Sequence, residues 1–334
     1  MKNKKVLVTG GIGYLGTILI LKLLKKGHEV ITIDPLIFGR SNLINLEKYK
    51  NFHLEVGLTE DKYILNKVLG EKIDTIIHLS GLSNDPTAAL DFHLTKKANV
   101  DSTINLVSVA KKNKVNKFIF ASSCSVYGYT GADIFVNEES PLNPISAYAE
   151  SKLDSEKIIL SEGSENFSVS CFRKGTLFGF SPRMRFDLVI NSMTGLAFDQ
   201  NKIIINGGNQ WRPFLHVSDA ADFYSKTIEF DTKLINGKIF NLGGNSFNFK
   251  ILDLINFYKE IFPNLKIENS DNLDKRSYKV SFDKIKDELN WSPEITIKKG
   301  ILEIKEKLEK DEIKDFRDIN YYNIKRMLSY LNIQ

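Results

Sequence analysis

The chain contains few of the residues on which disulfide-bonded, metal-binding or membrane-spanning proteins depend. Two cysteines, Cys124 and Cys171, occur among 334 residues, which excludes a disulfide framework and suits the cytosol. The five histidines show no metal-ligand spacing, so we expect no protein-bound metal. No segment approaches the roughly 18 consecutive apolar residues of a membrane span, and the apolar stretch after Lys5 is too short for a signal peptide. We therefore expect a cytoplasmic protein without a membrane partner.

A strong charge of one sign is also lacking. The 46 basic and 41 acidic residues leave a net charge of +5 and are spread along the chain. No basic run carries interleaved aromatic residues, which argues against a nucleic-acid partner. Hydrophobic residues make up 42% of the chain, an ordinary share for a globular protein. The length is large for a single core and predicts two lobes.

Strand and helix patterns alternate through roughly the first half of the chain. Apolar runs typical of buried strands lie at residues 5–9, 29–33, 52–56, 74–79, 117–121 and 167–172. Helical patterns lie at residues 14–26, 60–70, 88–113 and 146–163. This alternation predicts an α/β fold of the Rossmann type, with a doubly wound parallel sheet and helices on both faces.

The last third has a different character. We expect short strands with Gly and Asn turns at residues 202–208 and 237–244, and helices at 218–229, 250–262, 282–288 and 298–309. We interpret residues 1–175 as the Rossmann domain and residues 176–334 as a smaller α/β substrate-binding lobe that closes over the ends of the sheet. Residues 213–245 are expected to return partly to the first domain.

The first strand pattern runs directly into Gly10, Gly13 and Gly16, and an apolar helix pattern follows. Gly10 allows the tight turn out of the strand, Gly13 lets backbone approach phosphates, and Gly16 lets the helix lie close to the strand. The helix N-terminus then offers free N–H groups and the positive end of its dipole to an anion. This stretch, with Tyr14 and Leu15, is the predicted site for a dinucleotide pyrophosphate.

The second strand pattern ends in an acidic residue, Asp34, which lies 18 residues after Gly16. An acid near this spacing accepts hydrogen bonds from the adenosine ribose hydroxyls. A carboxylate there would also repel a 2′-phosphate, so the sequence predicts NAD rather than NADP as the cofactor.

Tyr148 and Lys152 lie four residues apart in a helical pattern, so their side chains share one face. An ammonium beside a phenol favours the phenolate and lowers the Tyr pKa, and a cationic nicotinamide would lower it further. The result is a base able to take a hydroxyl proton near neutral pH. An earlier strand pattern ends in Ser122 and Ser123, at the position where such sheets bind ligands. A serine there can hold the substrate oxygen while Tyr148 takes its proton.

These motifs together resemble the extended short-chain dehydrogenases/reductases of the nucleotide-sugar epimerase/dehydratase family. Further matching segments extend the likeness over nearly the whole chain, at residues 78–80, 99–100, 122–128, 211–219, 278 and 289–291. The resemblance implies NAD, a nucleoside-diphosphate sugar as substrate, and oxidation at sugar C4 as the opening step. It makes Ser123 the catalytic hydroxyl, Tyr148 the base and Lys152 its activator. The implied cofactor contacts also include Leu79, Ser80, Asn99, Tyr148 and Lys152.

Departures from the family pattern narrow the subgroup. The 4,6-dehydratases carry Asp and Glu directly after the catalytic hydroxyl, where this chain has Cys124 and Ser125. Members that epimerise at C3 and C5 carry a Cys where this chain has Ser125, and Cys124 is one place away. The pattern favours an enzyme like UDP-glucose 4-epimerase, of the kind used in polysaccharide biosynthesis. The alternatives are a 4-dehydrogenase that releases the 4-keto sugar and a catalytically inactive NAD-sensing protein.

Arginines indicate where a diphosphate could bind, because a planar guanidinium forms bidentate contacts with phosphate oxygens. They favour a nucleotide sugar over a sterol-like or flavonoid-like substrate. Arg212 matches the family arginine that grips the pyrophosphate, and Arg276 could lie at the substrate mouth. Arg183 and Arg185 follow a strand and turn and are interpreted as pyrophosphate or sugar contacts. The remaining predicted substrate contacts are Ser83, Ser125 and Thr176.

Two further positions differ from relatives. Many epimerases bind diphosphate with an Asn where Thr176 stands, and relatives usually bond adenine with an Asp where Leu58 stands. We therefore expect the adenine to be held by packing or by another group.

The resemblance also implies a homodimer, because two long helices of each family subunit pack as a four-helix bundle. The helices at 88–113 and 146–163 are the candidates, with Leu106, Val107 and Val109 on or near the buried stripe.

Overall fold

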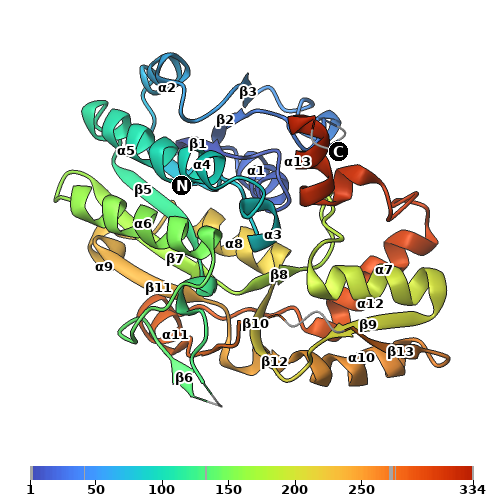
Figure 1. Ribbon diagram of the computed structural model, residues 1–334. Helices are drawn as coiled ribbons and strands as arrows, with labels where there is room; N and C mark the ends of the chain where they lie inside the picture. Colours follow the sequence, from blue (N-terminus) through green and yellow to red (C-terminus); the bar gives the residue numbers. More distant parts are fainter. Residues whose placement is uncertain (1–2, 41, 132–133, 271–273, 275, 333–334) are drawn as a thin grey trace.

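A parallel sheet of seven strands forms the centre of the described part of the molecule (Figure 1). The computed structural model describes residues 3–40, 42–131, 134–270, 274 and 276–332. The strand order is β11-β7-β5-β4-β1-β2-β3, and every pair in it is parallel. The strands are β1 (Lys5–Thr9), β2 (Glu29–Asp34), β3 (Phe52–Val56), β4 (Thr75–His78), β5 (Lys117–Ser123), β7 (Ser168–Lys174) and β11 (Lys238–Leu242). The predicted Rossmann-type fold is confirmed.

Helices cover both faces of this sheet because successive strand residues point to opposite sides. Along β1, Val6 and Val8 pack into one hydrophobic core and Leu7 into another. The first core includes side chains of α1 (Gly16–Lys25) and α8 (Val217–Thr227), and the second those of α2 (Lys62–Leu69), α5 (Ser102–Lys112) and α6 (Ala147–Glu162). Both faces are therefore buried, which explains the nearly continuous apolar runs in the sequence.

The helix expected over residues 88–113 is divided in the structure. It consists of α3 (Asp85–Ala88), α4 (Phe92–Lys96), a π-helical turn at Lys97–Asp101, and α5. Asp91 ends the first piece and begins the next, because its side chain accepts the backbone N–H of Leu94 as an N-cap. The expectation of one continuous helix was wrong, since N-capping at Asp91 restarts the helix.

A smaller lobe lies beyond the carboxyl ends of the strands, at the lower right of Figure 1. It has its own hydrophobic core, which includes Phe178, Ile203 and Ile301. Its sheets join β8 (Thr176–Phe178), β10 (Trp211–His216) and β12 (Asn248–Lys250), and pair β9 (Lys202–Asn206) with β13 (Lys266–Ser270). Its helices are α7 (Val189–Gln200), α10 (Leu254–Ile261) and α12 (Ile297–Glu309).

The chain passes between the two lobes more than once. After β10 it returns through α8 and α9 (Thr232–Ile235) to β11, which pairs with β7 at the edge of the main sheet. Strand β6 (Phe135–Val136) forms a short parallel pair with β14 (Lys279–Val280). Helix α11 (Asp283–Leu289) follows β14 in the chain. The last helix, α13 (Asn323–Leu331), folds back toward the first lobe, where Arg326 Nε donates to the Ile37 carbonyl at 2.7 Å.

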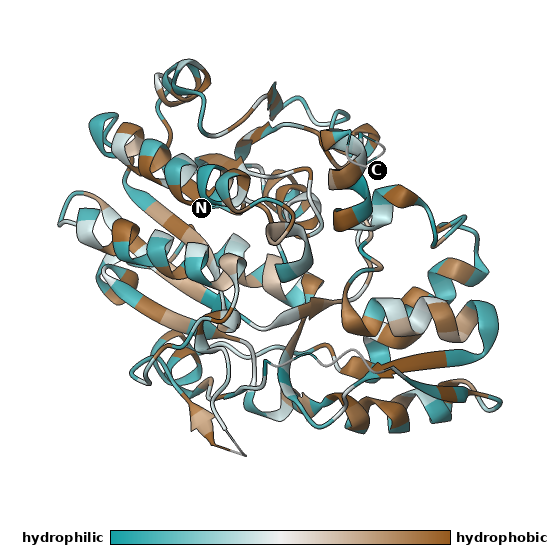
Figure 2. Cartoon of the chain, viewed as in Figure 1, coloured by the Kyte–Doolittle hydropathy of each residue, from teal (hydrophilic) through white to brown (hydrophobic). Residues whose placement is uncertain are grey.

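Hydropathy follows this architecture. Figure 2 shows hydrophobic residues along the central strands and helices that carry hydrophobic and hydrophilic residues in alternating bands. Among the described helices, none is both long and apolar enough to span a bilayer.

Candidate active site

A cleft opens at the carboxyl ends of β1 and β4, where the strand order reverses direction. This is the position at which open parallel sheets bind ligands. One end of the cleft is lined by the glycine turn and Asp34, and the other by Tyr148, Lys152 and Lys174. Tyr14, Leu15, Leu79, Ser80, Ser83, Arg183 and Arg185 also line it.

The glycine turn follows the expected roles. Gly10 has φ +67°, and a Cβ there would stand 2.8 Å from Ser80 Cα, so the turn and the close approach both require glycine. A Cβ on Gly16 would stand 2.6 Å from the Gly10 carbonyl oxygen. A Cβ on Gly13 would meet only that oxygen, at 3.2 Å. Gly13 therefore leaves an open approach to the start of α1, which has no side-chain cap and no acidic residue in its first turn.

Asp34 lies at the end of β2 with its carboxylate inside the same cleft. It accepts the backbone N–H groups of Ile12 at 3.0 Å and Leu36 at 2.8 Å. Burial raises the pKa of this carboxyl group, while these N–H groups and the nearby Arg183 guanidinium lower it. The acid is therefore fixed beside the glycine turn, where a ribose would lie.

The loop after β4 is held by Asn99. Its Oδ1 accepts the Leu82 N–H at 2.7 Å, and its Nδ2 donates to Ser151 Oγ at 2.8 Å. Asn99 is buried and does not line the cleft. It ties the loop that carries Leu79 and Ser80 to helix α6, so its predicted role in the cofactor site is exerted through this loop.

The predicted catalytic side chains meet at the other end of the cleft. Ser146 caps α6 by accepting the Ala149 N–H at 3.2 Å, so the helix starts at Ala147, one residue before Tyr148. Ser123, at the end of β5, lies near enough to the Tyr148 hydroxyl to lower the pKa of that phenol. Lys152 Nζ donates to the Ala121 carbonyl at 3.1 Å and lies 5.9 Å from the Tyr148 ring centroid. The Ser123 hydroxyl, the Tyr148 phenol and the Lys152 ammonium therefore lie near one another.

The electrostatics of this group differ from the sequence-based expectation. Burial raises the pKa of Tyr148 to about 12, although the hydrogen bond from Ser123 and the charge of Arg185 lower it. Burial, together with the charge of Lys174, lowers the pKa of Lys152 to about 7. The predicted lowering of the Tyr148 pKa was wrong for the protein alone, because burial of the phenol outweighs the lowering by Ser123 and Arg185.

A buried ion pair lies directly beneath this group. Arg173 Nη2 and Glu156 Oε2 are 2.7 Å apart, and each side chain is only 2% exposed. Glu156 also accepts the Ser122 hydroxyl at 2.5 Å, and Arg173 donates to the Tyr127 hydroxyl at 3.2 Å. Since Glu156 lies one turn beyond Lys152, the pair fixes α6 against β5 and β7.

Arg185 belongs to a second polar network on the cleft wall. It pairs with Asp187 at 2.8 Å and donates to Ser83 Oγ at 3.3 Å. Asn84 Nδ2 donates to Asp187 at 2.7 Å. The network joins the loop after β4 to the smaller lobe. The Arg185 guanidinium is also close enough to Tyr148 to lower the pKa of that phenol.

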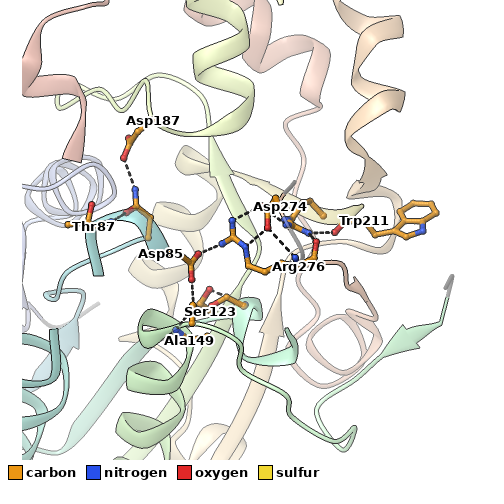
Figure 3. A network of polar contacts seen from close by, with 12 residues as sticks. Asp85, Thr87, Ser123, Ala149, Asp187, Trp211, Asp274 and Arg276 are labelled. Atoms are coloured by element: carbon orange, nitrogen blue, oxygen red, sulfur yellow. Dashed lines mark hydrogen bonds and ion pairs between the residues drawn. The ribbon is translucent and has the colours of Figure 1, made fainter. Parts of the chain in front are cut away.

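Arg276 and Asp274 belong to a cluster of charged side chains (Figure 3), which Arg212 joins by pairing with Asp274. Neither arginine is among the residues that line the cleft. Asp274 pairs with Arg212 at 2.8 Å and with Arg276 at 2.6 Å. Arg276 also pairs with Asp85, which accepts the hydroxyl of Ser146. The two guanidiniums hold the pKa of Asp274 far below its usual range.

Residues 6–243 match the model described as the NAD dependent epimerase/dehydratase family. The chain belongs to this family. It is accordingly an NAD-dependent enzyme of the extended short-chain dehydrogenase/reductase group, and NAD is its cofactor.

Three relatives illustrate the range of the family. The chain is similar to the dTDP-D-glucose 4,6-dehydratase of Bos taurus, with 30% identity over 89% of this chain and 86% of that protein. It is 27% identical to a putative UDP-glucose 4-epimerase of Methanocaldococcus jannaschii, over 89% and 95% of the two chains. The UDP-glucuronic acid 4-epimerase of Bacillus cereus, in complex with UDP-glucuronic acid and NAD, superimposes with a TM-score of 0.81 and 25% identity, over 92% and 99%.

The residues present fit the family's cofactor. The glycine turn with its uncapped helix start, Asp34, and the Tyr148–Lys152 pair line one continuous cleft. The adenine end is lined by Leu58, Thr59 and Glu60. Tyr14 lies between the lobes, where its hydroxyl donates to the Gly179 carbonyl at 2.6 Å.

The other predicted substrate contacts differ in their surroundings. Ser125 is buried, and its hydroxyl has no hydrogen-bond partner in the described ranges. Thr176 is partly buried on β8, next to β10, outside the cleft lining. The Cys124 thiol donates to the Arg173 carbonyl, and burial raises its pKa far above the usual range, so Cys124 is not a base.

Sequence reasoning did not single out several residues of the cleft. Lys174 and Asn323 line it, and Asp187 and Asp85 pair with the predicted arginines. Asn323 accepts from Arg183 at 2.6 Å and donates to Ser83 Oγ at 3.1 Å. For Lys174, its position at the end of a strand was the one feature of the sequence that could have indicated a place in the cleft. In the described ranges, no group of three or more His, Cys, Asp or Glu could hold a metal ion.

Proposed function

We propose that this enzyme is a nucleotide-sugar 4-epimerase, which oxidises its substrate at C4 and returns the hydride to the opposite face. The observation that carries this proposal is that Tyr148 and Lys152 line the same cleft as the glycine turn, with Ser123 near the Tyr148 hydroxyl at the end of β5. Bound NAD supplies the hydride acceptor. Ser123 orients the C4 hydroxyl, Tyr148 takes its proton, and the Lys152 ammonium stabilises the phenolate.

The residues beside Ser123 favour epimerisation over 4,6-dehydration. Loss of the C6 hydroxyl needs an acid and a base next to the reacting sugar. Here the two positions after Ser123 hold a buried thiol with a strongly raised pKa and a serine hydroxyl. Neither group supplies or removes a proton near neutral pH, so the 4-keto sugar is reduced again rather than dehydrated.

Arg212 and Arg276 are the proposed contacts of the substrate diphosphate. Their guanidiniums present planar donor sets on either side of Asp274, outside the cleft lining itself. The charges of the two arginines and of Asp85 and Asp274 cancel in this structure. A diphosphate therefore binds by displacing carboxylate from guanidinium, an exchange that would also rearrange the contact between Asp85 and the cap of α6.

The relatives support the same class of substrate. They include a putative UDP-glucose 4-epimerase and a UDP-glucuronic acid 4-epimerase. The test is to incubate the purified enzyme with UDP-, GDP-, CDP- and dTDP-sugars and to identify products by NMR, while absorbance at 340 nm reports NADH. A C4 epimer without net NADH supports the proposal. Stoichiometric NADH with a released 4-keto sugar would identify a 4-dehydrogenase instead.

A further inference from the structure

Lys174 is a cleft residue for which the proposed chemistry has no task. It is the last residue of β7, and the sheet register places it beside Ser123, the last residue of β5. Its side chain is partly buried, and it lines the cleft together with Tyr148 and Lys152. The ammonium therefore belongs to the same part of the cleft as Tyr148 and Lys152, whereas Arg212 and Arg276 are not part of the cleft lining.

The Lys174 ammonium has no anionic partner in the described part of the chain. Its Nζ donates to the Ser122 carbonyl at 2.9 Å, which uses one of its three N–H groups. The groups that act on it electrostatically are the Cys124 thiol and the Arg185 guanidinium. Burial lowers the pKa of Lys174 to about 8. A desolvated ammonium without a counterion is costly, so its retention calls for an anion.

The neighbouring charges do not provide that anion. Arg185 is already neutralised by Asp187, and Lys152 is a second cation whose pKa Lys174 lowers. The nicotinamide ring of oxidised NAD adds a further positive charge to this end of the cleft. The proposed diphosphate contacts, Arg212 and Arg276, belong to the separate cluster around Asp274.

We propose that Lys174 binds a carboxylate at C6 of the substrate sugar, so that the substrate is a nucleoside-diphosphate hexuronic acid. This inference rests on the proposed function, because it needs a nucleotide sugar in the cleft. The carboxylate accepts the free N–H groups of Lys174 and neutralises the surplus charge beside Lys152. Lys174, which donates to the Ser122 carbonyl and has no anionic partner in the described part of the chain, then becomes a specificity determinant.

The test compares pairs of nucleotide sugars that differ only at C6: UDP-glucose with UDP-glucuronic acid, and GDP-mannose with GDP-mannuronic acid. We expect the uronic acid of the accepted pair to have a lower KM, by roughly 10- to 100-fold, as for a hydrogen bond to a charged group. Lys174→Met, which removes the charge, should raise the KM of the uronic acid by about this factor relative to its neutral partner. Lys174→Arg should restore most of the preference.

The pH dependence and a matched control complete the design. The ratio of kcat/KM for uronic acid over neutral sugar should fall as pH rises through about 8, since the ammonium is lost there. Lys202→Met, at a surface lysine paired with Glu268, should leave both sugars unchanged.

Four outcomes would overturn the inference. Equal KM values for the two sugars would show that Lys174 does not recognise the carboxylate. An equal loss on both sugars in Lys174→Met, together with weaker NAD binding, would assign Lys174 to the cofactor. If neutral sugars alone react, this inference fails while the proposed function stands. If no nucleotide sugar binds, both fail.

Discussion

The Tyr148 hydroxyl is the single atom on which the proposed reaction depends most. Tyr148→Phe keeps the ring and its packing but removes the group that accepts the proton. We expect turnover to fall by about two to four orders of magnitude, the usual contribution of a positioned acid or base. NAD binding should persist, because the glycine turn and Asp34 are untouched. The measurement is steady-state turnover on the sugar identified by the screen, with NAD affinity determined in parallel.

Ser123→Ala provides the comparison for this variant. It should cost less than Tyr148→Phe, since Ser123 orients the substrate hydroxyl without keeping its proton. A Tyr148→Phe enzyme that retained most of its activity and bound NAD normally would contradict the mechanism.

The two titrating groups of the site predict a pH profile. The pKa values of Lys152, about 7, and Tyr148, about 12, mean that both carry a proton below about pH 7. Between these values the two groups hold one proton between them, as phenol with amine or as phenolate with ammonium. The oxidation step needs this single-proton form. We therefore expect its kcat/KM to rise with pH through about 7 and then level off.

The measurement is the initial rate of NADH formation, or of product formation, from pH 5.5 to 9. In Lys152→Met the step near pH 7 should disappear along with most of the activity. A wild-type rate that falls as pH rises through 7 would rule out these protonation states for Lys152 and Tyr148.

Asp34 and Arg183 together predict the cofactor preference. Asp34 presents a carboxylate where a 2′-phosphate would lie, and Arg183 is near enough to lower the pKa of that acid. Asp34→Ala removes the repulsion and leaves the guanidinium, so NADP affinity should increase while NAD affinity falls. Titration calorimetry with both cofactors measures the change. The double variant Asp34→Ala/Arg183→Met should lose the gain in NADP affinity. If the unmodified enzyme bound NAD and NADP with similar affinity, Asp34 would not set the cofactor preference.

At the scale of elements, the position of helix α6 depends on the ion pair between Glu156 and Arg173. Both side chains are 2% exposed, so removing one charge leaves the other buried without a partner. Glu156→Gln should lower the free energy of unfolding by about 3–5 kcal/mol. Urea denaturation followed by circular dichroism measures this change.

The matched control is Glu268→Gln on β13. Glu268 pairs with Lys202 at 3.2 Å on the surface, where its side chain is 51% exposed. An exposed pair contributes less than about 1 kcal/mol, so the control should remain close to the parent. Similar effects of the two substitutions would show that the buried pair does not hold α6.

For the whole molecule, we expect a homodimer formed through α5 and α6. Leu106 and Val107 lie in the monomer core beneath the sheet, so they do not form the outward face of these helices. The outward face of α5 includes Ile104, which is 44% exposed. Ile104→Glu should therefore shift the protein toward monomer in sedimentation experiments at micromolar concentration, because a charge buried in an interface is costly.

Leu302→Glu is the control for this substitution. Leu302 is also 44% exposed but lies on α12, in the smaller lobe, so it should leave association unchanged. A monomeric parent protein, or a dimer indifferent to Ile104→Glu, would count against the proposed interface.

The sequence alone determined the fold class, because parallel strands buried on both faces have apolar runs that a single sequence reveals. It also determined the glycine turn, Asp34, and the Tyr148–Lys152 pair, since these depend on spacings within one strand, turn or helix. The break before α4 escaped prediction because local capping at Asp91 interrupts an otherwise helical pattern.

Only the tertiary structure decided which distant residues share the cleft. Lys174, Asp187 and Asn323 meet there through strand register, lobe packing and the return of the C-terminal helix, none of which leaves a local pattern. The pKa of Tyr148 was likewise beyond the sequence, because it depends on how deeply the phenol is buried. Residue types and spacings indicated which chemistry was present, and three-dimensional packing decided the charges and partners of the groups that carry it out.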